Sequence, residues 1–113
     1  KVAETESFLA FLDVNPKALG HTLVVHKKEV NKLFDLDREA YLGLMDFAYT
    51  VAGALEKAVP CKRIGMAVIG LEVPHVHIHL IPLNQMTDAT FGKKVTLSQE
   101  EFVAVAEKIA GNL

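Results

Sequence analysis

Three histidines alternate with apolar residues in one short run, and this run constrains the fold more than any other feature of the chain. His75, His77 and His79 are separated by Val76 and Ile78. Because successive side chains of a β-strand point to opposite faces, an extended run places the three imidazoles in a row on one face. Imidazole can be a nucleophile, a proton donor, a phosphate contact or a metal ligand, so the pattern predicts a chemical site on a strand.

Short apolar and β-branched stretches predict the strands of a sheet. We expect them at residues 1–3, 8–12, 21–26, 63–69 and 75–81. The connection 70–74 is short enough to return the chain as an antiparallel hairpin, and we expect Pro82 to end the histidine strand.

Two further stretches have the three- and four-residue spacing of amphipathic helices. The longer one covers residues 37–59, where Asp35 or Asp37 can cap the start and Pro60 stops the helix. The second covers residues 97–109 and opens with a Ser-x-x-Glu capping box. Strands before and after one long helix, with an additional C-terminal helix, predict an antiparallel α+β fold.

Composition narrows the class of protein. The 113 residues fit one domain, 1–113, and the net charge of −2 carries no basic stripe, so polymeric nucleic acid is not an expected partner. No apolar stretch approaches the roughly 20 residues of a membrane span, so no membrane partner is expected. Cys61 stands alone, which predicts a reducing, cytoplasmic location. The chain starts at Lys1 rather than Met, and we expect that a segment precedes it.

Three blocks of sequence carry a family resemblance. They are Leu-Ala-Phe-Leu-Asp-Val-Asn-Pro at 9–16, Gly-His-Thr-Leu-Val-Val-His-Lys-Lys at 20–28 and the histidine run at 75–81. In this order, with a long helix between the last two, they resemble the histidine triad (HIT) superfamily over residues 1–83, with a C-terminal loop and helix at 84–113. The resemblance implies a HIT-like fold, a five-stranded antiparallel sheet with the long helix between strands 3 and 4.

The resemblance also implies an activity. Similar proteins hydrolyse or transfer nucleoside monophosphate groups from phosphoramidates, dinucleoside polyphosphates or adenylates through a covalent nucleotidyl-histidine, and are usually homodimers. The expected partner is a purine-nucleotide-type small molecule, and the scheme requires no metal or other cofactor. By position in the motif, His77 is the nucleophile, His79 and His21 flank the α-phosphate, and His75 supports them.

The chemistry places one demand on the nucleophile. A neutral imidazole attacks only through a nitrogen that carries no proton, so the other ring nitrogen must donate to a fixed acceptor. We therefore expect one ring nitrogen of His77 to donate to a group such as a backbone carbonyl.

The nucleoside contacts also follow from the resemblance. Asp13 stands where the family places a carboxylate for the ribose hydroxyls, and Phe11 and Val14 stand where apolar residues line the base pocket. Val73 is assigned to nucleotide binding as well. Simpler interpretations stay open, because Phe11 can be a core residue and Asp13 can open the Asn-Pro turn that follows.

The loop before the histidine run departs from the family. Relatives commonly carry polar groups there that hold the bridging phosphate atoms or the leaving group, whereas this loop offers Glu72 and Val73. Glu72 can repel an anionic phosphate, or burial can raise its pKa so that it protonates the leaving group.

Two other functions fit the same residues. The three alternating histidines together with His21 can hold Zn²⁺ or Fe²⁺, because imidazole suits both ions. Alternatively, the protein binds nucleotides without turnover and regulates a partner.

Overall fold

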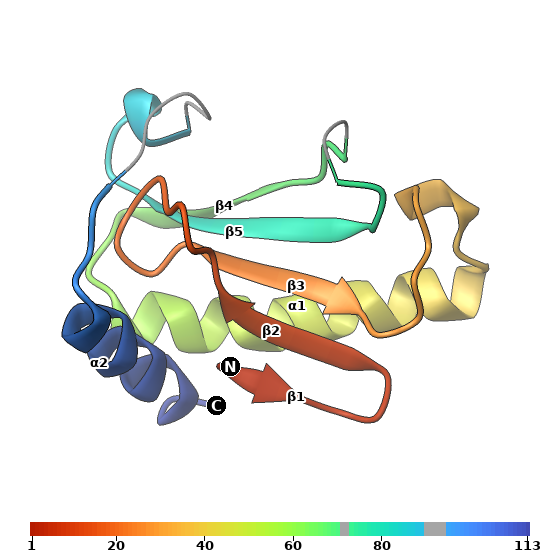
Figure 1. The fold of residues 1–113 in the computed structure, drawn as a ribbon, viewed down its shortest axis with the longest axis horizontal. Coiled ribbons are helices and arrows are strands. Elements are labelled where there is room, and N and C mark those ends of the chain that lie inside the picture. The colour runs from red at the N-terminus through yellow and green to blue at the C-terminus, as the bar shows by residue number, and fades with distance from the viewer. Residues whose placement is uncertain (71–72, 90–94) are drawn as a thin grey trace.

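The computed structural model describes residues 1–70, 73–89 and 95–113, and it confirms the α+β fold. The strands are β1 (Ala3–Glu4), β2 (Phe8–Leu12), β3 (Thr22–His26), β4 (Arg63–Ala67) and β5 (His77–Leu83). The helices are α1 (Arg38–Ala58) and α2 (Gln99–Ala110), with short 3₁₀ helices η1 (Leu33–Asp35) and η2 (Met86–Ala89). The strands form a five-stranded antiparallel sheet in the order β1-β2-β3-β5-β4, so the histidine strand lies between β3 and β4 (Figure 1).

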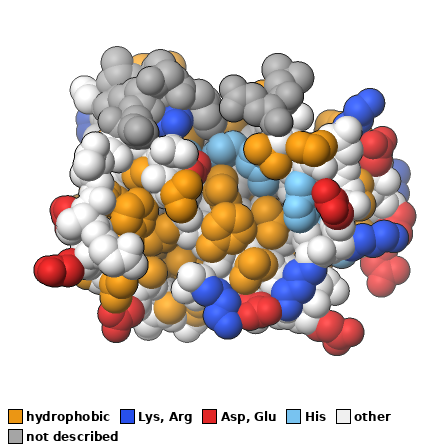
Figure 2. Space-filling view, in the orientation of Figure 1, with side chains coloured by type: hydrophobic (Ala, Val, Ile, Leu, Met, Phe, Trp, Pro, Cys, Tyr) orange, Lys and Arg blue, Asp and Glu red, His pale blue; other side chains and the backbone are white. Residues whose placement is uncertain are grey.

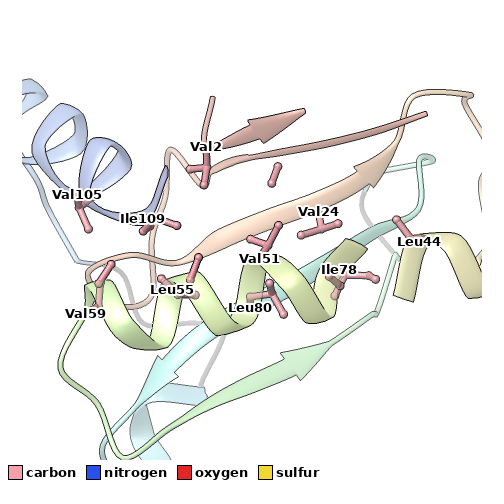
Figure 3. Close-up of a cluster of buried hydrophobic side chains, with 14 residues drawn as sticks. Val2, Val24, Leu44, Val51, Leu55, Val59, Ile78, Leu80, Val105 and Ile109 are labelled. Atoms are coloured by element: carbon pink, nitrogen blue, oxygen red, sulfur yellow. The ribbon is translucent and has the colours of Figure 1, made fainter. Parts of the chain in front are cut away.

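Helix α1 covers one face of the sheet. Its start is capped by Asp37, whose carboxylate accepts the backbone N–H of Ala40 at 2.8 Å. Its apolar stripe is buried against the strands, as Figure 3 shows for Leu44, Val51 and Leu55 beside Val24 and Ile78. Neither helix in the described part of the chain combines the length and apolar character needed to cross a membrane.

The strand register separates the two faces of the sheet. Paired residues of antiparallel strands share a face. Two rows across β2, β3 and β5 face α1, Ala10–Val24–Ile78 and Leu12–Thr22–Leu80. The opposite face carries the rows Leu9–Val25–His77 and Phe11–Leu23–His79. Figure 2 shows histidine side chains gathered on this face beside a broad hydrophobic area, and we call it the histidine face.

Helix α2 closes the fold at the end of α1. The predicted capping box is present: the Ser98 hydroxyl accepts from the backbone N–H of Glu101, and the Glu101 carboxylate accepts from the backbone N–H of Ser98. Val105 and Ile109 are buried in the same cluster as Val2 (Figure 3). The C-terminal helix therefore extends the core of the sheet rather than standing apart from it.

The predicted start of the histidine strand is wrong. Strand β5 begins at His77, and His75 lies in a bend before it. The reason is local hydrogen bonding: the N–H of His75 donates to the carbonyl of Val73 at 2.8 Å, and the N–H of Val76 donates to the carbonyl of Val30 at 2.7 Å. These bonds take the chain out of the sheet register. Two imidazoles of β5, not three, therefore lie on the histidine face.

The predicted end of this strand is also wrong, because β5 continues through Pro82 to Leu83. Pairing with β3 ends at Leu80, so at Pro82 the strand has one neighbour, which is Ile64 of β4. A residue without a backbone N–H is tolerated where a strand has an unpaired side. Strand β4 is shorter than expected and ends at Ala67.

Candidate active site

His21 is set at the start of β3 by a tight turn. Gly20 has φ of +88°, a conformation that favours glycine, and a Cβ there would lie 2.9 Å from Cγ2 of Val59 and 3.1 Å from Cδ1 of Leu55. The Thr22 hydroxyl donates to the carbonyl of Gly20 at 2.7 Å. The His21 side chain that results is almost fully buried, with 1% of the residue exposed.

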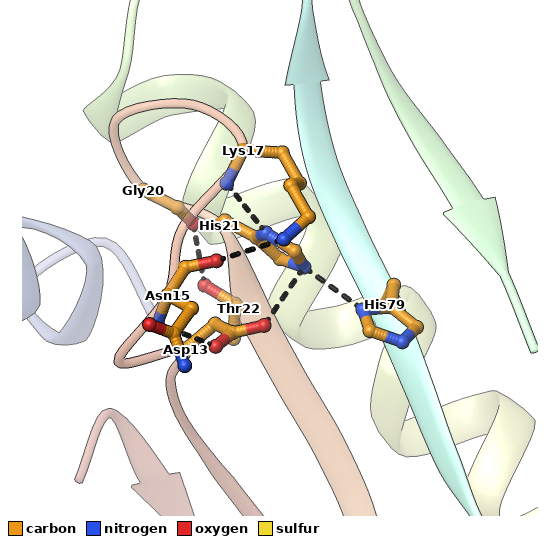
Figure 4. Close-up of polar contacts among 7 residues, drawn as sticks. All are labelled: Asp13, Asn15, Lys17, Gly20, His21, Thr22 and His79. Carbon is orange, nitrogen blue, oxygen red and sulfur yellow. Dashed lines mark hydrogen bonds and ion pairs between the residues drawn. The ribbon is translucent and has the colours of Figure 1, made fainter. Parts of the chain in front are cut away.

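The backbone assigns the proton on His21. Nδ1 of His21 accepts the backbone N–H of Lys17 at 3.0 Å, so the proton of the neutral ring is on Nε2 (Figure 4). Nε2 lies 2.9 Å from Nδ1 of His79, which must then be the acceptor. The proton of a neutral His79 ring is therefore on its own Nε2. One backbone N–H thus fixes the tautomers of two histidines, one immediately before β3 and one on β5.

His77 has the opposite arrangement. Its Nδ1 lies 2.8 Å from the backbone carbonyl of His75, and a carbonyl can only accept, so Nδ1 carries the proton. Nε2 of the neutral ring then has a free lone pair. This hydrogen bond is the carbonyl contact expected of a nucleophilic histidine.

His75 supports this geometry from outside the strand. Its Nε2 lies 2.8 Å from the carbonyl of His26, at the end of β3, and donates to it. The contact ties the bend before β5 to the neighbouring strand. Since the carbonyl of His75 holds the ring of His77, the bend positions that ring through the backbone.

The imidazoles deepest in the site are kept neutral. Burial, together with the neighbouring His79 and Lys17, lowers the pKa of His21 to about 4, against an opposing effect of Asp13. Burial also lowers the pKa of His79, with smaller contributions from His77 and Lys17. At neutral pH both rings are therefore hydrogen-bonding groups without charge.

Asp13 has two contacts, and each matches one interpretation of this residue. One carboxylate oxygen, Oδ1, accepts the backbone N–H of Asn15 at 2.8 Å, so Asp13 does shape the Asn-Pro turn. The other, Oδ2, lies 3.5 Å from Nε2 of His21. The carboxylate is therefore at the edge of the histidine cluster, and its contact with ribose stays a prediction.

Phe11 lies on the histidine face, so its interpretation as a core residue is wrong. With Val14 it lines an open groove, whose other wall is α2 with Gln99, Phe102 and Val103. Val14 is 80% exposed and Val73 is 52% exposed. The two predicted base-pocket residues, Phe11 of β2 and Val14 in the loop after it, thus share one groove beside the site, and Val73 lies in the bend before β5.

The described residues contain one group suited to a metal, but its hydrogen bonds oppose metal binding. Asp13, His21 and His79 offer ligand atoms within 4.8 Å of one another. A ligating histidine normally donates from its other ring nitrogen, yet Nδ1 of His21 already accepts from Lys17. Binding a cation through Nε2 would set two N–H groups against each other. The cluster fits a hydrogen-bond acceptor, such as a phosphate oxygen, better than a metal ion.

Sequence reasoning missed the groups that orient the rings, which are the N–H of Lys17 and the carbonyl of His26. Both belong to the backbone, so no residue type signals them, and only the path of the chain brings them to the rings. Glu72 lies outside the described residues, and its effect on a phosphate or a leaving group stays a prediction.

Comparisons with known proteins agree with the geometry. The family model described as HIT domain matches residues 1–86. The chain is 32% identical to the adenosine 5′-monophosphoramidase hnt1 of Schizosaccharomyces pombe, covering 100% of this chain and 87% of that protein. It is 30% identical to the asymmetrical bis(5′-nucleosyl)-tetraphosphatase of the same organism, over 96% of this chain and 58% of that protein. The crystal structure of a Hit-like protein involved in cell-cycle regulation from Bartonella henselae superposes with a TM-score of 0.85 at 29% identity, covering 99% of this chain and 84% of that one. This protein is therefore a member of the HIT domain family.

Proposed function

We propose that this protein cleaves nucleotide substrates by transferring a nucleoside monophosphate group first to His77 and then to water. The observation that carries the proposal is the hydrogen bond from Nδ1 of His77 to the carbonyl of His75, because it leaves a lone pair on Nε2. Two relatives bear the names of a phosphoramidase and a dinucleoside tetraphosphatase, and these names support a nucleotide as the substrate class.

The reaction has two steps. The Nε2 lone pair of His77 attacks the α-phosphorus, a nitrogen–phosphorus bond forms, and the bond from phosphorus to the leaving nitrogen or oxygen breaks. The leaving group keeps that electron pair and takes up a proton. Water then attacks the same phosphorus and loses a proton, the bond to Nε2 breaks, and the nucleoside monophosphate is released. Two smaller barriers replace one large barrier.

The other histidines stabilise the phosphoryl group. Because Nδ1 of His79 accepts from His21, the N–H on Nε2 of His79 can donate to a phosphate oxygen as charge develops there. His21 holds His79 in this tautomer, and its own Nε2 proton is a second donor if the substrate displaces the 2.9 Å contact between the rings. His75 keeps the ring of His77 in place through the backbone.

The nucleoside extends along the histidine face toward α2. Asp13 accepts hydrogen bonds from ribose hydroxyls, and the groove beside Phe11 and Val14 takes the base. Phe11 and His79 lie in one cross-strand row with Leu23 between them, two strand spacings or roughly 10 Å apart, which suits a ribose between base and phosphate.

A homodimer is part of this proposal. Strand β4 is an edge of the sheet with an unpaired side, and beside it Met66 is 46% exposed and Tyr49 is 81% exposed. A second copy that pairs with this edge would cover both side chains. Light scattering on the unmutated protein and on Tyr49→Glu tests this, with a dimer expected for the first and a monomer for the second; equal masses contradict it.

The test of the function compares His77→Ala with a matched histidine variant, His26→Gln. His26 lies on β3, and its ring accepts the N–H of Lys28 rather than facing the site. Each protein is incubated with adenosine phosphoramidate, AMP release is followed, and acid-quenched samples are examined by intact-protein mass spectrometry for bound AMP. We expect His77→Ala to lose turnover by about a thousandfold or more and to carry no adduct.

The control should keep both turnover and adduct. Turnover that survives in His77→Ala contradicts the covalent step at this residue. Tight binding of AMP with no turnover in the unmutated protein indicates a nucleotide-binding protein without catalysis.

A further inference from the structure

The charges at the site do not by themselves favour an anionic substrate. His21 and His79 are neutral, and the carboxylate of Asp13 lies 3.5 Å from Nε2 of His21. A phosphate group that reaches these rings therefore approaches a negative charge. A cation near the rings is needed to offset it, because such charges interact strongly over a few ångströms in a partly buried site.

Lys17 is the described cation placed to do this. Its backbone N–H holds Nδ1 of His21, and its ammonium donates to the carbonyl of Asn15 at 3.2 Å. Figure 4 shows the side chain folded back toward the imidazole of His21 instead of extending away from the loop. The residue is half-buried, and its charge acts on both His21 and His79.

The contact with Asn15 holds the ammonium of Lys17 in place and uses one of its N–H donors. An ammonium has three N–H donors, and the carbonyl of Asn15 takes one of them. A lysine held in this way has already lost part of its side-chain freedom, so it binds a phosphate at a smaller entropic cost. The loop of residues 13–21 thus presents a carboxylate and an ammonium on the two sides of one histidine.

The lysines nearest in sequence are placed differently. Lys27 follows the other end of β3, six residues or about 20 Å from His21 along the strand, and pairs with Glu4. Lys1 also pairs with Glu4, at 2.8 Å. These ion pairs hold strand β1 near the end of β3. Of these three lysines, Lys17 is the one in contact with the histidine cluster.

We propose that Lys17 binds the phosphate chain of the substrate and selects for its charge, so that nucleoside polyphosphates are preferred over singly charged phosphoramidates. This inference rests on the proposed function and adds a specificity-determining residue to it. The attraction grows with the number of phosphate charges near the ammonium, whereas the hydrogen bonds from the histidines to the α-phosphate are common to both substrates.

The test uses Lys17→Gln and Lys17→Arg, with Lys57→Gln as the matched control. The backbone N–H that holds His21 is kept in all of them, and Lys57 lies in the last turn of α1 on the other side of the sheet. The kcat/KM is measured for diadenosine tetraphosphate and adenosine phosphoramidate, and the Kd for ADP and AMP by calorimetry. We expect Lys17→Gln to lower kcat/KM about tenfold for the tetraphosphate and less than about threefold for the phosphoramidate, as for loss of one charged hydrogen bond.

Two further results are expected. Lys17→Arg should keep the preference, and added salt should weaken it in the unmutated protein but not in Lys17→Gln, because salt screens exposed charges. Equal losses on both substrates would show that Lys17 acts only by positioning His21. Equal effects of Lys17→Gln and Lys57→Gln would show a general charge effect. Either result overturns the inference.

Failure of the proposed function can be recognised separately. If the unmutated protein releases no AMP from either substrate, transfer to His77 is wrong, and the calorimetry still tests Lys17. A preference for ADP over AMP that disappears in Lys17→Gln supports the role of Lys17 in binding, and a preference that is unchanged contradicts it.

Discussion

The two faces of the sheet are built from the same strands but are held by different interactions. On the face toward α1, Val24, Ile78 and Leu80 are completely buried among apolar side chains. On the histidine face, the rings of His75 and His77 are held by backbone carbonyls, and His21 by a backbone N–H. The side chains of one face are stabilised by burial, and the imidazoles of the other are oriented by hydrogen bonds to the backbone.

This difference has an energetic consequence. Burying a large apolar side chain contributes about 1.5–3 kcal/mol, whereas a single neutral hydrogen bond contributes about 1 kcal/mol net. The fold therefore depends mainly on the α1 face. We therefore expect that a ring of the histidine face can be removed without unfolding the sheet, and that neighbouring residues of β5 differ in their effects on stability and on the proposed activity.

The neighbours His77 and Ile78 give the largest test of this comparison. We expect Ile78→Ala to lower the free energy of unfolding by about 4 kcal/mol, because it leaves a cavity in the core. His77→Ala should lower it by less than about 1 kcal/mol, since the ring is half-buried on the open side. Chemical denaturation measures both.

Activity per folded molecule should show the reverse order, lost in His77→Ala and kept in Ile78→Ala. If the two substitutions destabilise the protein equally, the histidine face is part of the core and the comparison is wrong.

The next largest effect concerns pH. The pKa of His21 is about 4 in the folded protein, against an ordinary value of 6.5. Between these values the unfolded chain binds a proton that the folded chain does not, so the stability is present in full above pH 6.5 and is lost as the pH falls toward 4. We expect a loss of about 3 kcal/mol, because one pKa unit corresponds to about 1.4 kcal/mol.

Denaturant unfolding at a series of pH values measures this loss. His21→Gln is the comparison, because it removes the buried imidazole and should lose less stability over the same range. A parallel decline in both proteins would show that other groups cause the pH dependence.

The smallest expected change in stability is at Gly20, which lies between the α1 side of the sheet and His21. Gly20 precedes His21, and a Cβ added there meets Val59 and Leu55 of the α1 side. We expect Gly20→Ala to cost about 2 kcal/mol from its positive φ and this contact, and to weaken nucleotide binding by displacing His21. Calorimetry and thermal unfolding measure the two effects.

Gly53→Ala is the control, because a Cβ at Gly53 meets nothing within 4 Å. In the middle of α1 this change should stabilise the helix by about 0.5–1 kcal/mol. Similar effects of the two substitutions would mean that neither the conformation nor the packing at Gly20 constrains the site.

Regular elements could be predicted from the sequence because their signals are local. The periodicity of the stretch from Asp37 to Pro60 and the Ser98–Glu101 capping box predicted the helices, and the alternation in the histidine run predicted a strand with histidines on one face. The bounds of β5 could not be predicted, because the bend at His75 depends on Val30, far away in the chain, and Pro82 is accepted only where β3 has ended.

The sequence by itself determined which residue types stand at the site, and it predicted three histidines on one face, because the alternation of side chains along a strand is a property of the extended backbone. The bend at His75 leaves two of them, His77 and His79, on that face of β5. Only the tertiary structure decided which nitrogen of each ring is free. That depends on the N–H of Lys17 and on the carbonyls of His75 and His26, which every sequence contains and which act here because the fold brings them within hydrogen-bond distance of the rings.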